Sequence, residues 1–457
     1  MPDAAPTIVW FRRDLRLSDH PALAAAAAQG PVTALFVLDD VLLRSNEGPR
    51  TAYLLRTLRA LDADLRDHGG RLTVRRGRPQ AVVPALAREI GAAAVQISAD
   101  YAPYGSARDQ RVAEALGGTP LVRTGSPYAV APGRVVKGDG SPYAVFTPFY
   151  RGWVAHGWRG PADSRPEAVT WRLAEGDPIP PDPPISADLP EAGERAALQA
   201  WKRFRDNDLG TYGENRDRPD LDRTSHLSPH LKLGTIHPRT VLADLGASDG
   251  PYARQLAWRD FYAAVLHHWP HSATGDLRTQ LETMAYDTGA KADRHFGAWA
   301  SGRTGFPIVD AGMRHMLATG WMHNRLRMIV ASFLVKDLHI EWTRGARHFM
   351  DHLVDGDVAN NHHGWQWTAG TGTDPAPYFR VFNPVTQGRK CDPEGDYVRS
   401  WVPELRGISG DAVHNPVRAG AAAGYPAAIV DHATERAEAL ARYAAVTGGG
   451  RRGSARA

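Results

Sequence analysis

The sequence predicts an N-terminal α/β domain, built on a doubly wound parallel sheet, followed by an all-α C-terminal domain. Three observations support this prediction. Strand-like and helix-like segments alternate over residues 7–125, a proline-rich stretch follows at 160–193, and from residue 194 the pattern is helical with a higher density of tryptophan. A chain of 457 residues is also too long for a single compact core, so two or three domains are expected.

The N-terminal strands are short apolar runs separated by segments of helical character. The predicted strands are 7–11, 32–39, 71–76 and 93–100, and the predicted helices are 21–29, 51–68 and 80–90. Such alternation favours a parallel sheet, whose ligands bind beyond the carboxyl ends of the strands at the switch point. Neither the glycine pattern of a dinucleotide site nor a P-loop follows the first strand, so neither site is expected there.

The composition is ordinary for a globular protein, with 43% hydrophobic and 23% charged residues. The longest apolar runs have the length of strands, so no membrane span is expected. The single cysteine, Cys391, excludes an internal disulfide and a cysteine-based metal cluster. Because a signal-peptide layout is also missing, we expect a cytoplasmic protein. The net charge of +4 permits a polyanionic partner without predicting one.

Two predicted helices carry faces of mixed chemistry. In the first, four side chains share a face at i, i+3, i+4 and i+7, namely Gln255, Trp258, Arg259 and Tyr262. In the second, over 321–338, a core face is predicted for Met322, Leu326, Ile329, Val330, Phe333 and Leu334. Its other face holds Asn324, Arg327 and Met328, which suits the wall of a ligand cavity or, equally, a helix at a domain interface.

Acidic, hydroxyl and histidine clusters have two interpretations each. Asp355 and Asp357 flank a glycine. In one interpretation, one carboxylate pairs with an arginine and the other accepts hydrogen bonds from a ligand. In the other interpretation, the segment is a plain turn. The segment 224–228 offers hydroxyls for a phosphate, although Ser228 as the N-cap of a helix is the commoner explanation. The histidine pairs 267–268 and 362–363 have no clear third ligand, so hydrogen-bonded histidines are favoured and no metal is expected.

Long motifs along the chain resemble the photolyase/cryptochrome family, most closely the bacterial class I photolyases that repair cyclobutane pyrimidine dimers. The motifs include "WFRRDLRLSDHPAL", "TSHLSPHLKLG", "LAWRDFY", "WMHNRLRMIVASFLVKDL", "DGDVANN" and "WQWTAGTGTDPAPYFRVFNP". They occur in the family's order over residues 7–440. The resemblance implies an α/β antenna domain at 5–130, a linker at 131–193, a helical FAD-binding domain at 194–440 and a disordered tail at 441–457.

The resemblance also implies the residues of the FAD pocket. Phosphates and ribose would be held by Tyr212, Thr224, Ser225, His226, Leu227 and Ser228, and the next helix would contribute Tyr252, Gln255, Arg259 and Tyr262. Asn324 would face flavin N5, and Arg327 would pair with Asp355. Asp357 and Asn361 would meet the flavin edge and the ribityl chain.

The implied reaction is light-driven DNA repair by a monomer that binds UV-damaged DNA. Electron transfer from excited FADH⁻ splits a dimer that has been flipped out of the duplex. Gln255, Trp258, Asn324, Met328 and Trp367 would surround the dimer, and Arg216 and Arg325 would contact DNA phosphates beside the two tryptophans. Arg50, Asp100 and Lys232 match positions that bind the antenna 8-hydroxy-5-deazaflavin in relatives, with methenyltetrahydrofolate as the alternative antenna.

The sequence departs from the family at the relay, at position 255 and at His362 and His363 beside the expected flavin site. Trp365 and Trp342 match the proximal and middle members of the electron relay, but the distal tryptophan is missing and Tyr286 stands near its place. Tyr286 is therefore the expected terminal donor, unless photoreduction is slow or rerouted. At position 255, class I photolyases normally have glutamate, and an amide cannot supply a proton.

Three functions compete. A photolyase that repairs cyclobutane dimers fits the motifs best. A cryptochrome-like blue-light receptor, with weak or no repair, is the alternative that Gln255 keeps open. Repair of the (6-4) photoproduct is disfavoured, because relatives with that activity carry two histidines where Asn324 and Met328 stand.

Overall fold

The computed structural model describes residues 4–44, 48–373, 379–420 and 422–447. It divides into two compact units. The first unit consists of Met1–Gly213, Ser225–Pro270 and Val354–Ala359, and the second of Glu214–Thr224, His271–Leu353 and Asn360–Ala457. None of the helices in these described ranges combines the length and apolar character that crossing a bilayer requires.

The first unit is built on a five-stranded sheet with the strand order β3-β2-β1-β4-β5. The strands are β1 (Thr7–Phe11), β2 (Val32–Leu38), β3 (Leu72–Arg76), β4 (Ala94–Ile97) and β5 (Leu121–Arg123). All four neighbouring pairs are parallel. The four predicted strands are confirmed, whereas β5 escaped prediction because three residues are too few to show a pattern.

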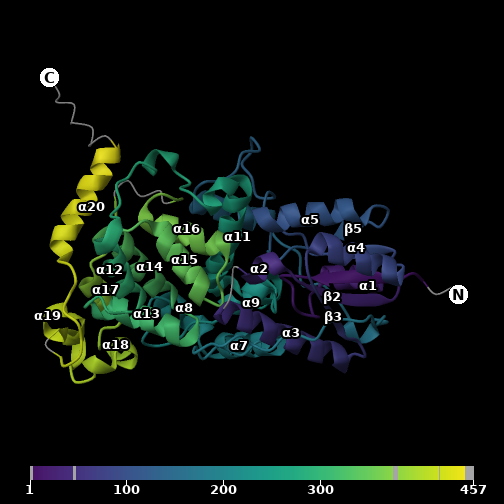
Figure 1. The fold of residues 1–457 in the computed structure, drawn as a ribbon, viewed down its shortest axis with the longest axis horizontal. Helices are drawn as coiled ribbons and strands as arrows, with labels where there is room; N and C mark the ends of the chain where they lie inside the picture. The colour runs from purple at the N-terminus through teal and green to yellow at the C-terminus, as the bar shows by residue number, and fades with distance from the viewer. Residues whose placement is uncertain (1–3, 45–47, 374–378, 421, 448–457) are drawn as a thin grey trace. The chain divides into compact units, whose positions relative to one another are not determined.

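Both faces of the sheet are buried, as a doubly wound arrangement requires. Within β1, Val9 and Phe11 belong to one hydrophobic cluster, and Ile8 and Trp10 belong to another. The first cluster includes residues of helices α1 (Pro21–Ala27) and α3 (Pro49–Asp67), and the second those of α4 (Pro79–Ile90) and α5 (Pro103–Leu116). Figure 1 shows these helices around the strands. The alternation follows from the two-residue period of a strand.

The remaining helices of the first unit lie between residues 40 and 268. They are α2 (Asp40–Arg44), α6 (Phe146–His156), α7 (Glu194–Asn207), α8 (Tyr212–Asn215, which continues into the second unit), α9 (Ser228–Leu233), α10 (Pro238–Ala243) and α11 (Gly250–His268). Helix α6 falls inside the segment expected to be a linker. Its Phe146, Phe149 and Trp153 are buried and give it an apolar stripe of helical spacing.

The second unit is helical. Its helices are α12 (Gly289–Ala300), α13 (Pro307–Thr319), α14 (Asn324–Ser332), α15 (Trp342–His352), α16 (Val358–Ala369), α17 (Pro384–Cys391), α18 (Asp396–Trp401), α19 (Pro416–Ala419) and α20 (His432–Thr447). The first two residues of α16 are grouped with the first unit. Figure 1 labels these helices in green to yellow.

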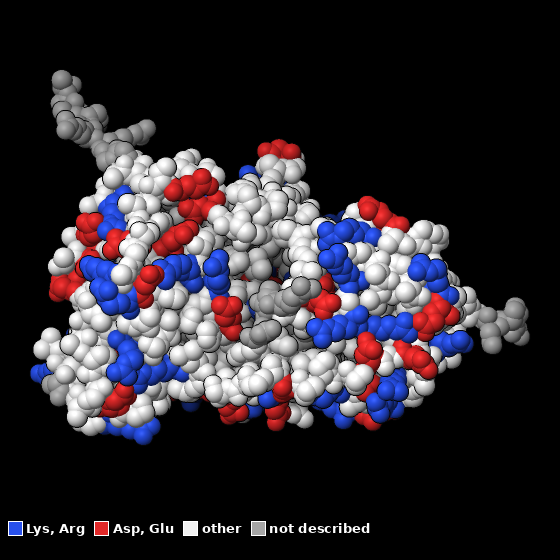
Figure 2. Space-filling view, viewed as in Figure 1, with Lys and Arg blue, Asp and Glu red and all other residues white. Residues whose placement is uncertain are grey.

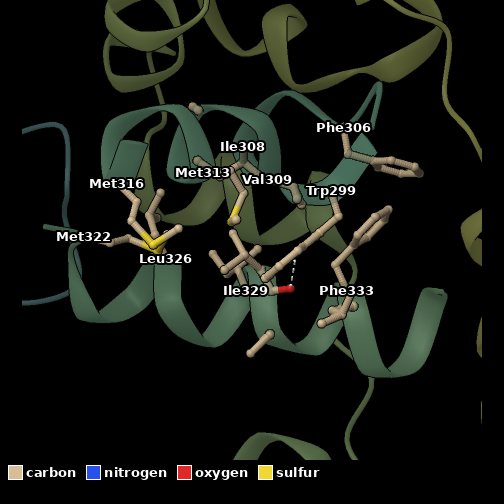
Figure 3. Packing of buried hydrophobic residues seen from close by; sticks show 14 of the residues in the cluster. Trp299, Phe306, Ile308, Val309, Met313, Met316, Met322, Leu326, Ile329 and Phe333 are labelled. Carbon is tan, nitrogen blue, oxygen red and sulfur yellow. Dashed lines mark hydrogen bonds between the residues drawn. The ribbon is translucent and has the colours of Figure 1, made fainter. Parts of the chain in front are cut away.

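The core of the second unit includes the face predicted for residues 321–338. All six predicted core residues are buried there, and Figure 3 shows Met322, Leu326, Ile329 and Phe333 pointing toward α13. The indole of Trp299 donates a hydrogen bond of 2.9 Å to the Val330 carbonyl. The helix is not uniform, however, because α14 continues as a π-helix over Phe333–Asp337.

The domain boundaries expected at residues 130, 193 and 440 stay predictions. The expected start of a disordered tail falls inside α20, which is helical to Thr447. The rest of that tail, residues 448–457, lies outside the described residues.

Candidate functional site

A charged cluster occupies the switch point of the sheet in the first unit. Arg13 follows β1, and Asp100 follows β4, so both lie at the carboxyl ends of strands where the strand order reverses. Arg13 forms an ion pair of 2.7 Å with Asp357, and the ammonium of Lys232 lies 3.6 Å from the same carboxylate. The cluster therefore joins the sheet edge to the end of α9.

The three antenna candidates belong to this cluster. Burial and the positive charge of Arg13 lower the pKa of Lys232 to about 8. The carboxylate of Asp357 acts in the opposite direction. Arg50 lowers this pKa and Asp100 raises it, both by smaller amounts. Asp100 is held by Arg108 at 3.3 Å and packs on Gly105, where an added Cβ would come within 2.0 Å of its carboxylate. The structure thus places Arg50 and Asp100 each within electrostatic reach of Lys232.

The aromatic residues of α7 hold the predicted FAD tyrosines. The Tyr252 ring stacks on Trp201 at 5.5 Å and meets Tyr212 edge-on at 5.1 Å. Its hydroxyl donates a hydrogen bond of 2.9 Å to Ser225 Oγ. Burial raises the pKa of Tyr252 well above its ordinary value. Tyr212, Tyr252 and Ser225 are therefore brought together as the sequence predicted.

Thr224 ends in a buried hydroxyl with no hydrogen-bond partner in the described ranges. A buried hydroxyl left unpaired costs free energy, so this atom fits a ligand that supplies the missing hydrogen bond. His226 adopts a left-handed backbone with φ 51°, and Leu227 is buried beside it. One expectation is wrong: Leu227, not Ser228, is the N-cap residue of α9, since the helix begins at Ser228.

Arg259 ties together three segments of the first unit. Its guanidinium donates hydrogen bonds to the carbonyls of Pro127 at 2.8 Å and Leu231 at 2.9 Å. It also lies 4.6 Å above the ring of Tyr128. Burial lowers the pKa of Arg259. The residue therefore positions α9 against α11, whatever it contributes to a ligand.

The predicted mixed face of α11 is present. The Trp258 indole stacks on Phe146 of α6 at 3.7 Å with an interplanar angle of 8°, and Tyr262 lies 5.3 Å from Trp258. Among the described residues, the Gln255 amide donates only to its own helix, 3.3 Å from the Pro251 carbonyl. Gln255 and Trp258 are both partly exposed, so the amide and one edge of the indole remain accessible.

The mixed face of α14 lies in the second unit. The Asn324 amide is 3.9 Å from the sulfur of Met328, one helical turn later. Arg327 donates to the Met322 carbonyl at 2.8 Å, and Asn361 of α16 donates to the Ala346 carbonyl at 2.9 Å. Asn324 is exposed and Met328 partly so. Asp355 and Asp357, both buried, belong to the first unit, and the predicted Arg327–Asp355 pair stays a prediction.

The two predicted DNA-binding arginines meet at one carboxylate. Arg325 forms an ion pair of 2.6 Å with Asp217, and Arg216 lies 3.9 Å from the same residue. Burial alone would raise the pKa of Asp217, but the hydrogen bond and charge of Arg325 lower it below its ordinary value. Asp217 therefore orients the Arg325 guanidinium, and Arg216 lies within electrostatic reach of the same carboxylate.

The relay tryptophans are buried in the core of the second unit, and Tyr286 packs against it. Trp365 meets Phe349 at 5.0 Å and Trp299 at 6.0 Å, both edge-on. Helix α15 approaches its ring so closely that a Cβ added at Gly345 would lie 2.2 Å from Trp365 Cη2. Only glycine fits there without displacing the ring.

Trp367, two residues along α16, borders an open pocket of the second unit. The pocket combines cations and aromatic rings, and its lining residues are Arg278, Ser332, Lys336, Trp367, Thr368, Gly370, Phe379, Arg380, Phe382 and Tyr443. The Arg380 guanidinium lies 5.6 Å above the Trp367 ring. Elsewhere, Lys and Arg are interspersed with Asp and Glu over the face seen in Figure 2. Aromatic and cationic side chains together suit an exposed base and its phosphate.

At least one of the four histidines, His363, follows the hydrogen-bonding interpretation. His363 is buried and pairs with Ser272 Oγ at 2.9 Å, and His362 lies edge-on to Trp342 at 5.8 Å. Within the described ranges, no group of three or more potential metal ligands was found.

Sequence reasoning missed Arg13, Phe146, Asp217 and Asp276. A signal existed for Arg13, because it follows the first strand at the end where parallel sheets bind ligands. Asp217 adjoins Arg216 in the chain, which hints at an ion pair. Phe146 and Asp276 make contacts with Trp258 and Trp342 that are distant in sequence, so the chain alone gives no sign of them.

Comparisons with known proteins agree over both parts of the chain. Residues 7–168 match the family described as DNA photolyase, and residues 252–445 match the FAD binding domain of DNA photolyase. The chain is 44% identical to the deoxyribodipyrimidine photo-lyase of Streptomyces griseus, with 94% of this chain and 97% of the relative covered.

Two solved structures also match nearly the whole chain. The crystal structure of a bacterial class III photolyase from Agrobacterium tumefaciens has a TM-score of 0.90 at 36% identity, covering 98% of this chain and 99% of that one. A cryptochrome from Synechocystis sp. PCC6803 has a TM-score of 0.86 at 27% identity, covering 96% and 99%.

Proposed function

The chain belongs to the DNA photolyase family, and on that premise we propose residue roles for the light-driven repair of cyclobutane pyrimidine dimers. Its activity is that of a deoxyribodipyrimidine photo-lyase acting on damaged DNA, and its cofactor is FAD. The observation that best supports the residue roles is the buried Thr224 hydroxyl, which lacks a hydrogen-bond partner in the described ranges and adjoins in the chain the Ser225 hydroxyl that Tyr252 contacts. A cytoplasmic monomer remains the expectation from the sequence.

The residues near α9 and α11 fit the phosphate and ribose portion of FAD. Thr224 offers a buried hydroxyl that lacks a partner in the described part of the chain, and Tyr252 holds the Ser225 hydroxyl in place. Also assigned to the cofactor are Tyr212, His226, Leu227, Ser228, Gln255, Arg259, Tyr262, Asn324, Arg327, Asp355, Asp357 and Asn361. Bound FAD supplies the excited electron donor, and these residues bind it, orient it and exclude water.

The surroundings of the dimer consist of Gln255, Trp258, Asn324, Met328 and Trp367. Stacking of Trp258 on Phe146 fixes one indole as a rigid apolar wall. Arg216 and Arg325, the latter oriented by Asp217, contact phosphates of the flipped strand. Affinity for damaged DNA should therefore fall as salt rises, because each phosphate contact releases counterions.

Replacing Gln255 with glutamate should raise the repair quantum yield. The Gln255 amide is partly exposed and makes only a 3.3 Å hydrogen bond within its helix, so the substitution disturbs no other contact of the described chain. A protonated carboxyl group can donate a proton to the electron-rich dimer, which an amide cannot. The measurement is the number of dimers split per absorbed photon. Equal yields in the two proteins would show that another group already provides this stabilisation.

Three residues of the cluster at the switch point, Arg50, Asp100 and Lys232, are assigned to an antenna. Lys232 and Arg50 give it positive charge, which favours an acidic chromophore such as 8-hydroxy-5-deazaflavin, with methenyltetrahydrofolate as the alternative. Asp100, fixed by Arg108 and Gly105, would accept hydrogen bonds from the chromophore ring.

Antenna binding should weaken as pH rises through about 8, which is the pKa of Lys232. Above this pH the free protein loses the ammonium charge that attracts an anion, so affinity falls by about tenfold per pH unit. Chromophore retention measured by absorbance between pH 6 and 10 tests this. In Lys232→Arg, which stays charged, this loss should vanish; an identical midpoint in both proteins would exclude Lys232 from the site.

The electron relay that reduces FAD in light is assigned to Trp365 and Trp342. Both indoles are 2% exposed within the same core. Beyond Trp342 two alternatives remain: Tyr286 as terminal donor, or a relay that ends at Trp342.

One assay separates the competing functions. The purified, chemically reduced protein is illuminated with oligonucleotides that carry either a cyclobutane dimer or a (6-4) photoproduct. We expect reversal of the cyclobutane dimer only. Reversal of neither lesion, with FAD bound, would favour a cryptochrome-like receptor, as the similarity to the Synechocystis cryptochrome allows.

A further inference from the structure

The indole of Trp342 donates a hydrogen bond to a buried carboxylate. Trp342 Nε1 lies 2.7 Å from Asp276 Oδ1, and the two residues are 2% and 7% exposed. Burial raises the pKa of Asp276, and the hydrogen bond from Trp342 opposes this effect. An N–H···O⁻ bond in a dry environment is stronger than a bond between neutral groups. The hydrogen bond therefore holds the Asp276 carboxylate against the Trp342 indole inside this core.

Tyr286 lies in a very different environment. Its hydroxyl is buried and has no hydrogen-bond partner among the described residues. Burial raises the pKa of Tyr286, and the carboxylates of Asp276 and Glu341 raise it further. At neutral pH a phenol loses an electron readily only when its proton can leave to a base. Tyr286 has no such base within hydrogen-bonding distance in the described chain, so its oxidation is disfavoured.

We propose that Asp276 is a positioning residue of the electron relay, whose carboxylate stabilises positive charge on Trp342 so that the relay ends there and not at Tyr286. The proposal rests on the function proposed above, because it requires the Trp365–Trp342 relay. It gives a physical reason for a relay without the distal tryptophan.

Photoexcited flavin is the oxidant and takes one electron from Trp365. One electron then passes from Trp342 to Trp365, which becomes neutral, while Trp342 becomes a radical cation that keeps its N–H proton. The nearby negative charge lowers the energy of this cation, because opposite charges attract strongly where water is excluded. An added thiol finally gives one electron to Trp342, which becomes neutral, and releases its proton to water. The thiyl radical left behind couples with a second one, from another turnover, to form the disulfide.

The test is the lifetime of the tryptophan radical after a laser flash, measured by transient absorption on the flavin-loaded protein. In Asp276→Asn the lifetime should shorten by about tenfold, the factor expected when a hydrogen bond to a charged group is weakened. Asp276→Glu should recover most of it. Glu282→Gln is the matched control, because it removes an exposed carboxylate that acts on Asp276 without bonding to Trp342. The control should stay within about twofold of wild type, since exposed charges are screened.

A readout without flavin examines the hydrogen bond itself. In the ¹H–¹⁵N spectrum of the apoprotein, the Trp342 indole resonance, assigned by its loss in Trp342→Phe, should lie downfield and exchange slowly with solvent. It should move upfield and exchange faster in Asp276→Asn, and remain in place in Glu282→Gln. An unchanged resonance in Asp276→Asn would overturn the proposal.

Two further outcomes decide the matter even if Asp276→Asn does not fold. Tyr286→Phe should leave the radical lifetime unchanged; a lifetime shortened more than twofold would overturn the proposal and make Tyr286 the terminal donor. A radical that persists in Trp365→Phe would contradict the relay itself. If Asp276→Asn does fold, loss of the radical in Trp365→Phe together with a normal lifetime in Asp276→Asn would refute the role of Asp276 alone.

Discussion

Light-driven reduction of the bound flavin should be abolished in Trp365→Phe, while the chemically reduced variant keeps wild-type repair. Trp365 is buried in contact with Phe349 and Trp299, in the same core as Trp342. In the proposed relay, every electron that passes from Trp342 to the flavin passes through Trp365. Phenylalanine fills most of the space but is much harder to oxidise. The measurement is the rate of flavin bleaching under blue light with a thiol present.

The control for this prediction is Trp299→Phe, which changes a tryptophan of the same core that the relay does not use. It should lose stability through its hydrogen bond to Val330 but retain photoreduction. If the Trp365→Phe protein bleached at the wild-type rate, electrons would reach the flavin by another route and the relay assignment would be wrong.

Replacing Gly345 with alanine should destabilise the protein by about 2 kcal/mol, because overpacking a core costs more than a better helix former returns. The added Cβ would lie 2.2 Å from Trp365 Cη2 and 2.6 Å from Leu334 Cδ2, and the indole cannot bend away. The ring of Trp365 has to shift, so photoreduction should slow as well. Denaturant unfolding monitored by tryptophan fluorescence measures the free-energy difference.

The matched control is Gly297→Ala in α12, where no atom lies within 4 Å of the added Cβ. That variant should be as stable as wild type or more stable by about 0.5–1 kcal/mol, because alanine favours the helix. Equal stability of both variants would mean that the second unit adjusts around Trp365 and that Gly345 is not needed for its placement.

The sheet could be predicted because its strands show a strong local pattern. Apolar runs such as residues 7–11 alternate with amphipathic helices, and the order of these segments alone favours a parallel, doubly wound arrangement. The core face of 321–338 was equally visible as a helical period. By contrast, the π-helix over Phe333–Asp337 could not be predicted from the sequence, because its apolar residues fit an α-helical period as well.

The candidate site was predicted mainly through motifs, and its supporting contacts were not. Trp258 was named, but its stacking partner Phe146 lies more than a hundred residues earlier in a segment expected to be a linker. Asp276, bonded to Trp342, stands in a loop without a recognisable pattern. Such pairs depend on distances between remote segments, which a sequence does not contain.

Arg259 illustrates an intermediate case. Its position on the mixed face of α11 was correctly predicted, and the resemblance assigned it to the cofactor. The structure adds that its guanidinium binds two backbone carbonyls and a tyrosine ring. A buried arginine with three partners organises its surroundings, and this role could not be distinguished from ligand binding by spacing alone.

The most direct test of the central claim is an action spectrum for splitting a cyclobutane dimer. The prereduced protein is mixed with an oligonucleotide that carries one dimer, and the number of dimers reversed per incident photon is measured across the near-ultraviolet and blue. We predict that repair occurs only in light and follows the absorption of reduced flavin, with an added band wherever an antenna is bound. Reversal in the dark, or no reversal at any wavelength that the bound flavin absorbs, would contradict the assignment as a light-driven DNA-repair enzyme.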